Sequence, residues 1–332
     1  MRPRPAGSYA RPMELRQLTT DDIPAWAGLL AAVEAVDETG EHYGETDLAE
    51  EMANPDVEVG KDFLGAYDGT ELVGYASVMP RGEADGVFKV HVQGAVRPDR
   101  RGEGIGAVLA RAMVDRGLAA GRERSSTLPV RLTATGLTSN EAQADLLTGL
   151  GMRGERWNFV MRTSLDDLGP ELPLAEGYAF VRYDESMADA VLDAHNAAFG
   201  GHHPNFTPWT PAMWKQWVTG SHSFRPATSV VVVPEGGDTV VGYVTTHEWE
   251  AYEKATGRRE AYVAKVGVLE EHRGRGIAGA LLSHCLRLYA EAGYDEASLD
   301  VDSENPTGAL GVYQRAGFEV ESRWTNYFLT VS

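Results

Sequence analysis

The chain has 332 residues, of which 43% are hydrophobic and 24% charged, an ordinary globular composition with enough apolar material for two domains. Its 30 Lys and Arg against 49 Asp and Glu give a formal net charge of -19. This acidic excess argues against nucleic acid or an anionic membrane as the main partner, because both require a net basic surface.

The single cysteine, Cys285, rules out an intramolecular disulfide and a cysteine-built zinc site. We expect no bound metal, and a reducing, cytoplasmic location fits best. No apolar run approaches the ~20 residues of a membrane span. The first dozen residues lack a hydrophobic stretch, so they predict a disordered arm and not a secretory signal.

The first half of the chain predicts an α/β unit. A short strand near Leu15 is followed by helices and then by a hairpin that ends at Gly74-Tyr75. A strand over residues 88–96 leads into a glycine-rich turn, residues 101–106, which we call the first turn. A helix is expected to begin there.

The periodicity stops at residues 164–173, where Pro, Gly and acidic residues gather, and this segment predicts a linker. It divides the chain into an expected N-terminal domain, 13–165, and an expected C-terminal domain, 176–332. The second half repeats the order of the first. Its expected elements are a strand at 180–181, helices, a hairpin ending at 242–243, a strand over 262–268, a second turn at 273–278, a helix over 276–291, a strand over 297–301, a short helix and a closing strand over 327–331.

The repeat is visible in the residues themselves. The first turn, Arg101-Gly102-Glu103-Gly104-Ile105-Gly106, corresponds to the second turn, Arg273-Gly274-Arg275-Gly276-Ile277-Ala278. Val73-Gly74-Tyr75 corresponds in the same order to Val241-Gly242-Tyr243. Matched landmarks in one order indicate a duplicated domain.

Both turns suit a phosphate group. The first N–H groups of a helix have no partner within it, and the helix dipole adds partial positive charge there. Glycines let the backbone approach a ligand closely. Arg101, Arg273 and Arg275 supply positive charge that the chain otherwise lacks. Neither turn has the residue pattern of a P-loop or of a dinucleotide-binding fingerprint.

The pattern Arg/Gln-x-x-Gly-x-Gly/Ala between a strand and a helix resembles the acetyl-CoA motif of the GNAT acyltransferases. Both halves carry it, so the resemblance covers residues 13 to 332. It implies two tandem GNAT domains, each a mixed, mostly antiparallel sheet flanked by helices, with acetyl-CoA as co-substrate. In this family the strand before the turn diverges from its neighbour and pairs with the pantetheine arm. The residues implied are Val266, Gly267 and Val268 with the second turn, and Gly94, Ala95 and Val96 with the first turn.

The segment from Asn305 to Phe318 resembles the family's Asn-x₃-Ala-x₃-Tyr-x₃-Gly-Phe pattern. The resemblance makes Tyr313 the proton donor to the departing thiolate, and a core tyrosine is the alternative. Asn305 is implied as a CoA contact and, before Pro306, also fits a helix N-cap. In the first half Leu147 stands where Tyr313 stands in the second. Leucine cannot donate a proton, so we expect catalysis in the C-terminal domain and an inert N-terminal domain.

Two carboxylates are equal candidates for the general base that takes a proton from the acceptor amine, namely Glu248 and Glu260. Each also fits a solvated acid at a strand end. Asp300 and Asp302, on one strand face, suit either contact with a cationic acceptor or exposure to solvent. The family implies that residues 202–224, rich in Trp and His, wall the acceptor pocket.

Three hypotheses follow. The leading one is an acetyl-CoA-dependent N-acetyltransferase that acts directly on a primary amine of a small molecule. The tandem layout also resembles mycothiol synthase, which acetylates cysteinyl-glucosaminyl-inositol, although its acidic residue on the cofactor strand is not cleanly matched here. A non-catalytic acyl-CoA sensor is the alternative from another class. The sequence leaves the acceptor, the occupancy of the first turn and the oligomeric state open.

Overall fold

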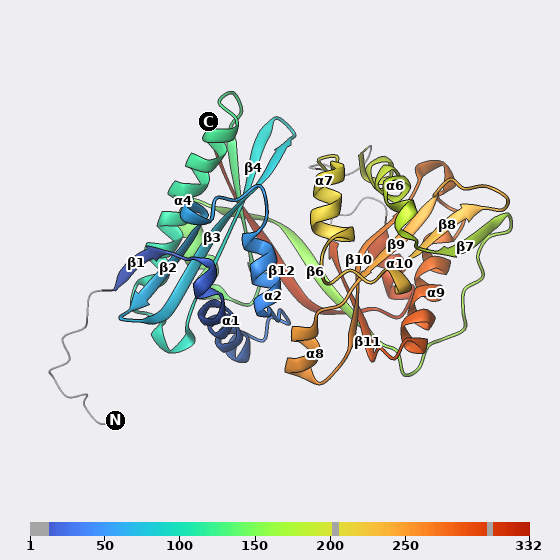
Figure 1. Cartoon of the computed structure of the whole chain (residues 1–332), viewed down its shortest axis with the longest axis horizontal. Coiled ribbons are helices and arrows are strands. Elements are labelled where there is room, and N and C mark those ends of the chain that lie inside the picture. The colour runs from blue at the N-terminus through green and yellow to red at the C-terminus, as the bar shows by residue number, and fades with distance from the viewer. Residues whose placement is uncertain (1–12, 201–205, 304–307) are drawn as a thin grey trace.

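The computed structural model describes residues 13–200, 206–303 and 308–332. The predicted N-terminal arm and Asn305 lie outside these residues. Within them, twelve strands join into one sheet with the order β1-β2-β3-β4-β5-β12-β6-β11-β10-β9-β8-β7. Helices cover both faces of this sheet in two lobes, which are joined by the long strands β6 and β12 (Figure 1). No helix of the described residues is long and apolar enough to cross a bilayer.

The elements follow the predicted order in both halves. In the first half they are β1 (Glu14–Gln17), α1 (Ile23–Asp37), α2 (Glu45–Met52), α3 (Val59–Asp62), β2 (Phe63–Asp68), β3 (Glu71–Ala84), β4 (Val87–Val96), α4 (Ile105–Arg124), β5 (Val130–Leu137), α5 (Glu141–Gly149) and β6 (Arg153–Ser164). In the second half they are β7 (Tyr178–Arg182), α6 (Ala188–Gly200), α7 (Pro211–Trp214), β8 (Val230–Pro234), β9 (Gly242–His247), α8 (Glu250–Thr256), β10 (Glu260–Val268), α9 (Ile277–Glu291), β11 (Glu296–Asp302), α10 (Ala309–Arg315) and β12 (Glu319–Val331).

Helix α9 shows how the sequence pattern positions the second turn. Ile277, Leu281, Cys285 and Leu288 are spaced at helical intervals, and all four are buried in the core of the second half. Burying this apolar stripe fixes the helix against the sheet. The N-terminus of α9 is thereby held directly after the end of β10. Cys285 is a core residue, as expected.

The closing strand of each half lies in the sheet of the other. Strand β12, from the end of the chain, pairs antiparallel with β5 of the first half, from Trp324 beside Leu137 to Val331 beside Val130. Strand β6 of the first half pairs in turn with β11 of the second. The two exchanged strands lie side by side in the middle of the sheet (Figure 1). Because β12 is paired on both edges, it is longer than the predicted strand over 327–331.

In each half two neighbouring parallel strands diverge. Strand β4 pairs with β5 only over Phe88–His91, yet it continues to Val96. Strand β10 pairs with β11 only over Glu260–Tyr262, yet it continues to Val268. Beyond these points the edge of each strand that faces its parallel neighbour has no strand partner. The divergence implied by the family resemblance is confirmed in both halves.

Candidate active site

The second turn joins the free end of β10 to α9. Gly274 and Gly276 have φ angles of +75° and +77°, a backbone region that suits glycine. The first N–H groups of α9 have no intrahelical partner. Arg275 is exposed and makes no ion pair within the described residues. The turn therefore presents main-chain donors and an unpaired guanidinium.

Arg273 binds two main-chain carbonyls. Its Nε donates to the carbonyl of Val268 at 3.1 Å, and one terminal nitrogen donates to the carbonyl of Ala198 at 2.7 Å. The guanidinium thus ties the end of β10 to the C-terminal part of α6. These contacts hold the strand end in place, and the contact with a phosphate stays a prediction.

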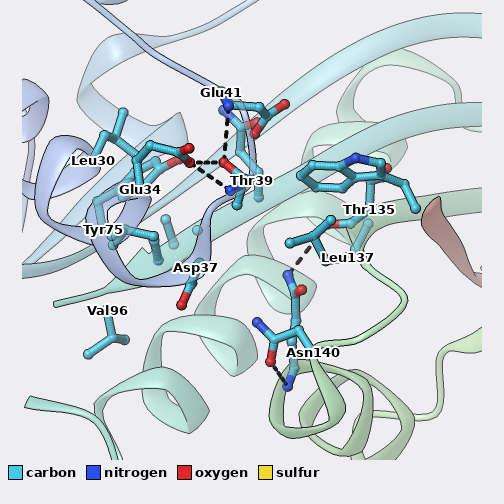
Figure 2. A pocket seen from close by; sticks show the side chains of 18 of the residues that line it. Leu30, Glu34, Asp37, Thr39, Glu41, Tyr75, Val96, Thr135, Leu137 and Asn140 are labelled. Atoms are coloured by element: carbon cyan, nitrogen blue, oxygen red, sulfur yellow. Dashed lines mark hydrogen bonds between the residues drawn. The ribbon is translucent and has the colours of Figure 1, made fainter. Parts of the chain in front are cut away.

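The first turn has the same backbone but different charges. Gly102 and Gly104 have φ angles of +79° and +84°. Arg101 Nε donates to the carbonyl of Val96 at 3.2 Å, as Arg273 does to Val268. Its terminal nitrogens, however, bind both oxygens of Asp37 at 2.7 and 2.8 Å. Figure 2 shows Asp37 and Val96 in this part of the pocket.

Val266, Gly267 and Val268 pair with β9 on one side, opposite Val244, Tyr243 and Gly242. A register shift between Val263 and Lys265 accompanies the divergence from β11. A Cβ atom at Gly267 would come within 2.7 Å of the Tyr243 ring, so glycine permits this close packing. The cofactor strand is therefore supported on one edge and unpaired on the other.

Tyr313 lies on α10, packed in the core of the second half beside Phe318 with ring centroids 6.3 Å apart. Burial, with a further contribution from the charge of Asp300, raises the pKa of the Tyr313 hydroxyl far above its ordinary value. The phenol therefore keeps its proton at neutral pH. A protonated phenol close to a carboxylate can act as a proton donor.

A central cavity of about 850 Å³ extends across both halves. It is lined by the divergent part of β4, the first turn and α5, and on the other side by Glu260, Tyr262, Ser298 and Asp300 of β10 and β11. Figure 2 shows the first-half wall, where Glu34 binds Thr39 and Asn140 caps α5. The cavity is large enough for a small-molecule ligand, since such pockets measure about 300–1,000 Å³.

The two predicted base candidates occupy different places. Glu260 is buried, lines the central cavity and accepts a hydrogen bond of 2.5 Å from Arg162. Burial raises the pKa of its carboxyl, although Arg162 opposes the shift. Glu248 lies instead in a separate open hollow. Only Glu260 is therefore in reach of a molecule in the central cavity.

Glu248 is held by basic and hydroxyl groups. It binds Arg225 at 2.6 Å and Tyr294 at 2.9 Å, and it also binds Arg259. Burial alone would raise its pKa, but these hydrogen bonds outweigh burial and lower the pKa below the ordinary value. A carboxylate that already accepts three donors is a weak proton acceptor.

Glu248→Gln is therefore expected to destabilise the fold without abolishing turnover. Losing charge-assisted hydrogen bonds should cost about 1–3 kcal/mol of the free energy of unfolding, measured by urea denaturation at pH 7. Because the folded pKa is depressed, this contribution exists above the ordinary pKa and is lost as pH falls, so the difference should shrink in acid. Glu250→Gln, in the same hollow but exposed, is the control. A catalytic role for Glu248 would instead appear as lost turnover at unchanged stability.

Asp300 and Glu41 are cavity carboxyls that make no ion pair within the described residues. Asp300 lies on β11 just beyond its last residue paired with β10, and it accepts a hydrogen bond of 3.0 Å from Asn158. Partial desolvation in the cavity raises the pKa of its carboxyl to about 6, although the residue remains exposed. Glu41, from the loop after α1, also lines the cavity and is exposed; desolvation there raises its pKa to about 7, and the charges of Glu34 and Asp300 add to this. Asp302, two residues on from Asp300, is paired with Arg156.

Sequence reasoning missed Glu41, which no motif or periodicity distinguishes. The expected solvent exposure of Asp300 is confirmed, and the surface that it is exposed to is the wall of the cavity. The alternation of Ala297, Leu299 and Val301 in the core with Ser298 and Asp300 on the other face was the available signal.

The described part of the segment 202–224, which the family resemblance implied as a wall of the acceptor pocket, packs away from the central cavity. Phe206, Trp209 and Trp214 surround the buried ring of His195. Trp217 lies under Arg81 of the first half, and His222 binds Asp47 at 2.8 Å. Residues 206–224 therefore help to join the two halves and do not line the central cavity. His202 and His203 lie outside the described residues. Among those described, no group of His, Cys, Asp and Glu is arranged to hold a metal ion.

Comparison with known proteins identifies relatives along most of the chain. The acetyltransferase (GNAT) family model matches residues 30–138 and 188–318, more than half of the chain. Mycothiol acetyltransferase of Thermobispora bispora is 32% identical over 319 residues, which cover 94% of this chain and 96% of that protein. The mycothiol acetyltransferase of Actinosynnema mirum is 33% identical over 264 residues, covering 79% and 80%.

Solved structures agree with this assignment. A GCN5-related N-acetyltransferase from Sphaerobacter thermophilus superposes with a TM-score of 0.75 at 25% identity, covering 96% of this chain and 95% of that one. A tandem GNAT protein from the clavulanic acid biosynthesis pathway gives a TM-score of 0.69 at 18% identity, with coverages of 96% and 99%, and supports the tandem fold. The chain therefore belongs to the GNAT acetyltransferase family and is an N-acetyltransferase with two GNAT regions.

Proposed function

We propose that the second half binds acetyl-CoA and transfers its acetyl group directly to a primary amine held in the central cavity. The observation that carries the proposal is the position of Asp300 on β11 beyond its pairing with β10, within electrostatic range of Tyr313 on α10. Asp300 faces the cavity, and its charge acts on the buried Tyr313 hydroxyl. In this proposal Tyr313 serves as the acid and Asp300 as the base, near the place where the family resemblance puts the thioester.

In this proposal the free edge of β10 at Val266, Gly267 and Val268 pairs with the amides of the pantetheine arm. The diphosphate lies on the N–H groups of the second turn, at Gly274, Gly276, Ile277 and Ala278, with Arg275 beside it. Arg273 acts indirectly, by fixing the strand end. Asn305 is kept as a predicted CoA contact outside the described residues.

The reaction needs three proton movements. The acceptor ammonium gives one proton to a cavity carboxylate, and its free nitrogen attacks the thioester carbonyl. The tetrahedral intermediate collapses, the carbon–sulfur bond breaks, and Tyr313 protonates the CoA sulfur as it leaves; the second proton lost by the nitrogen then restores the phenol. Asp300 and Glu260 are the candidate bases. We rank Asp300 first, because the Glu260 carboxylate already accepts a hydrogen bond from Arg162.

The acceptor is proposed to be a small cationic amine. Glu41 and Asp300 give the cavity acidic groups that suit an ammonium ion. Since proteins named mycothiol acetyltransferase match nearly the whole chain, the amine of cysteinyl-glucosaminyl-inositol is the first acceptor to test. Polyamines, amino acids and aminoglycosides complete the panel.

Release of free CoA thiol tests the proposal. With acetyl-CoA and the amine panel, we expect amine-dependent thiol release well above the hydrolysis seen without amine, and mass spectrometry should show an acetylated product. Tight CoA binding without turnover of any amine would contradict the proposal and support the sensor hypothesis. Absence of CoA binding would contradict both.

A further inference from the structure

The charges around the first turn oppose a second CoA. Each arginine next to or within that turn is neutralised by carboxylates; the pairs are Arg97 with Glu71 and Asp99, Arg100 with Asp68 and Glu103, and Arg101 with Asp37. In the second turn the residue equivalent to Glu103 is Arg275, which is unpaired within the described residues. A diphosphate at the first turn would meet carboxylates where the second turn offers a free guanidinium.

The first arginine of each turn also differs between the two halves in what it binds. Arg273 binds a neutral main-chain carbonyl, that of Ala198. Arg101, at the matching position, binds the ionised side chain of Asp37 through two hydrogen bonds. The first turn keeps the glycine backbone of a phosphate site, but its arginine is already paired with a carboxylate.

The space beyond the first turn is built for an uncharged group. Between the divergent strands β4 and β5 lies a part of the central cavity that we call the first-half cleft. Its walls are mainly apolar and include Val96, Ile105, Leu109, Ala134, Leu147 and Leu150. Thr135, Asn140 and Gln143 add neutral polar atoms. Leu147 stands in the place of the proton donor, so nothing there suits thioester chemistry.

The first-half cleft is continuous with the proposed acceptor site. The same cavity of about 850 Å³ contains the cleft walls and the second-half residues Glu260, Tyr262 and Asp300. Glu41, from the first half, faces this shared space. An amine placed at Asp300 thus has a route for the rest of its molecule into the cleft.

Building on the proposed function, we infer that the first-half cleft binds the non-reacting end of the acceptor and not a second CoA. The acceptor class is an elongated amine whose ammonium group lies between Asp300 and Glu41 and whose other end is uncharged and carries no phosphate. The first half is then a specificity element for the reaction in the second.

The first test is the stoichiometry and charge dependence of CoA binding, measured by isothermal titration calorimetry of the full chain with CoA. We expect one CoA per chain. Arg275→Glu, which gives the second turn the charge of the first, should weaken binding about tenfold. The matched change Glu103→Arg should leave the affinity unchanged. Two CoA molecules per chain, or a single site that responds to Glu103→Arg and not to Arg275→Glu, would overturn the inference while leaving an N-acetyltransferase possible.

The second test fills the cleft. Ala110 of α4 lines the cavity, whereas the exposed Ala107, one turn earlier on the same helix, does not. Ala110→Phe should raise the KM for the acceptor about tenfold or more and leave the KM for acetyl-CoA within twofold, while Ala107→Phe changes neither. The acceptors are cysteinyl-glucosaminyl-inositol and the best amine of the panel. Urea denaturation checks that both variants are folded.

The outcomes separate the two proposals. Failure of the wild type to turn over any amine contradicts the proposed function, on which the inference rests. Turnover in the wild type with an unchanged acceptor KM in Ala110→Phe contradicts the inference alone. An increase confined to the KM for acetyl-CoA would show that the cleft binds the cofactor, and it too would overturn the inference.

Discussion

Tyr313→Phe is expected to lower kcat by about 10²–10⁴-fold, the range typical for loss of a general acid or base. The substitution removes only the hydroxyl, and the ring keeps its packing beside Phe318. Without it the thiolate must leave without a proton from the protein. Affinity for CoA, measured by calorimetry, should stay within about twofold, since the proposed cofactor contacts are on β10 and the second turn.

Tyr183→Phe is the matched control for this variant. Tyr183 is also a buried tyrosine of the second half, but it lies in a different core cluster from Tyr313, and within the described residues its hydroxyl has no hydrogen-bond partner. Its kcat should equal that of the wild type. If Tyr313→Phe retained more than a third of the wild-type kcat, Tyr313 would not be the proton donor, and the assignment of catalysis to the second half would lose its chief support.

Asp300→Asn is expected to lower kcat/KM about 10²-fold or more and to change its dependence on pH. A base must be ionised to accept a proton, and the Asp300 carboxyl has a pKa of about 6. Wild-type kcat/KM should therefore fall as pH drops through about 6. In the variant the part of this limb near pH 6 should disappear, since asparagine does not titrate, and any limb that remains is assigned to Glu41, whose pKa is about 7. Stopped assays of thiol release between pH 5 and pH 8 measure both effects.

Other groups around Asp300 also influence its pKa, and control variants are needed to separate their effects from its own. Asn158 donates to it, Lys265 lowers its pKa and Asp302 raises it. Asp302→Asn changes a neighbouring carboxylate on the same strand face, and Glu260→Gln removes the other candidate base. Both should keep the acid limb. If Glu260→Gln abolished the limb and Asp300→Asn kept it, Glu260 would be the base and Asp300 an acceptor contact.

Local features of this protein could be predicted from its sequence. The two glycine turns, the helix that follows each one and the burial of Cys285 depend on residues within about fifteen positions of one another. Periodicity and backbone preference act over that range, and the structure bears these features out. The divergence of the strands came from family resemblance and is likewise confirmed.

Long-range pairings could not be predicted in the same way. Glu41 reaches the second-half carboxyls through the tertiary fold, and Asp37 meets Arg101 across 64 positions of the chain. Glu248 is separated from Glu260 because Arg225, Arg259 and Tyr294 bind Glu248 beside a separate hollow. No periodic pattern encodes such contacts, because each arises only after the strands have found their neighbours.

The exchange of β6 and β12 has a consequence for the integrity of the molecule. Each lobe takes its last strand from the other half of the chain, so neither half can complete its sheet alone. Proteolytic cleavage of the connection between β6 and β7 would leave two fragments. Main-chain hydrogen bonds along β6 and β12 would still hold these fragments together. The peptide link between the lobes is thus dispensable for their cohesion, and they should melt as one cooperative unit.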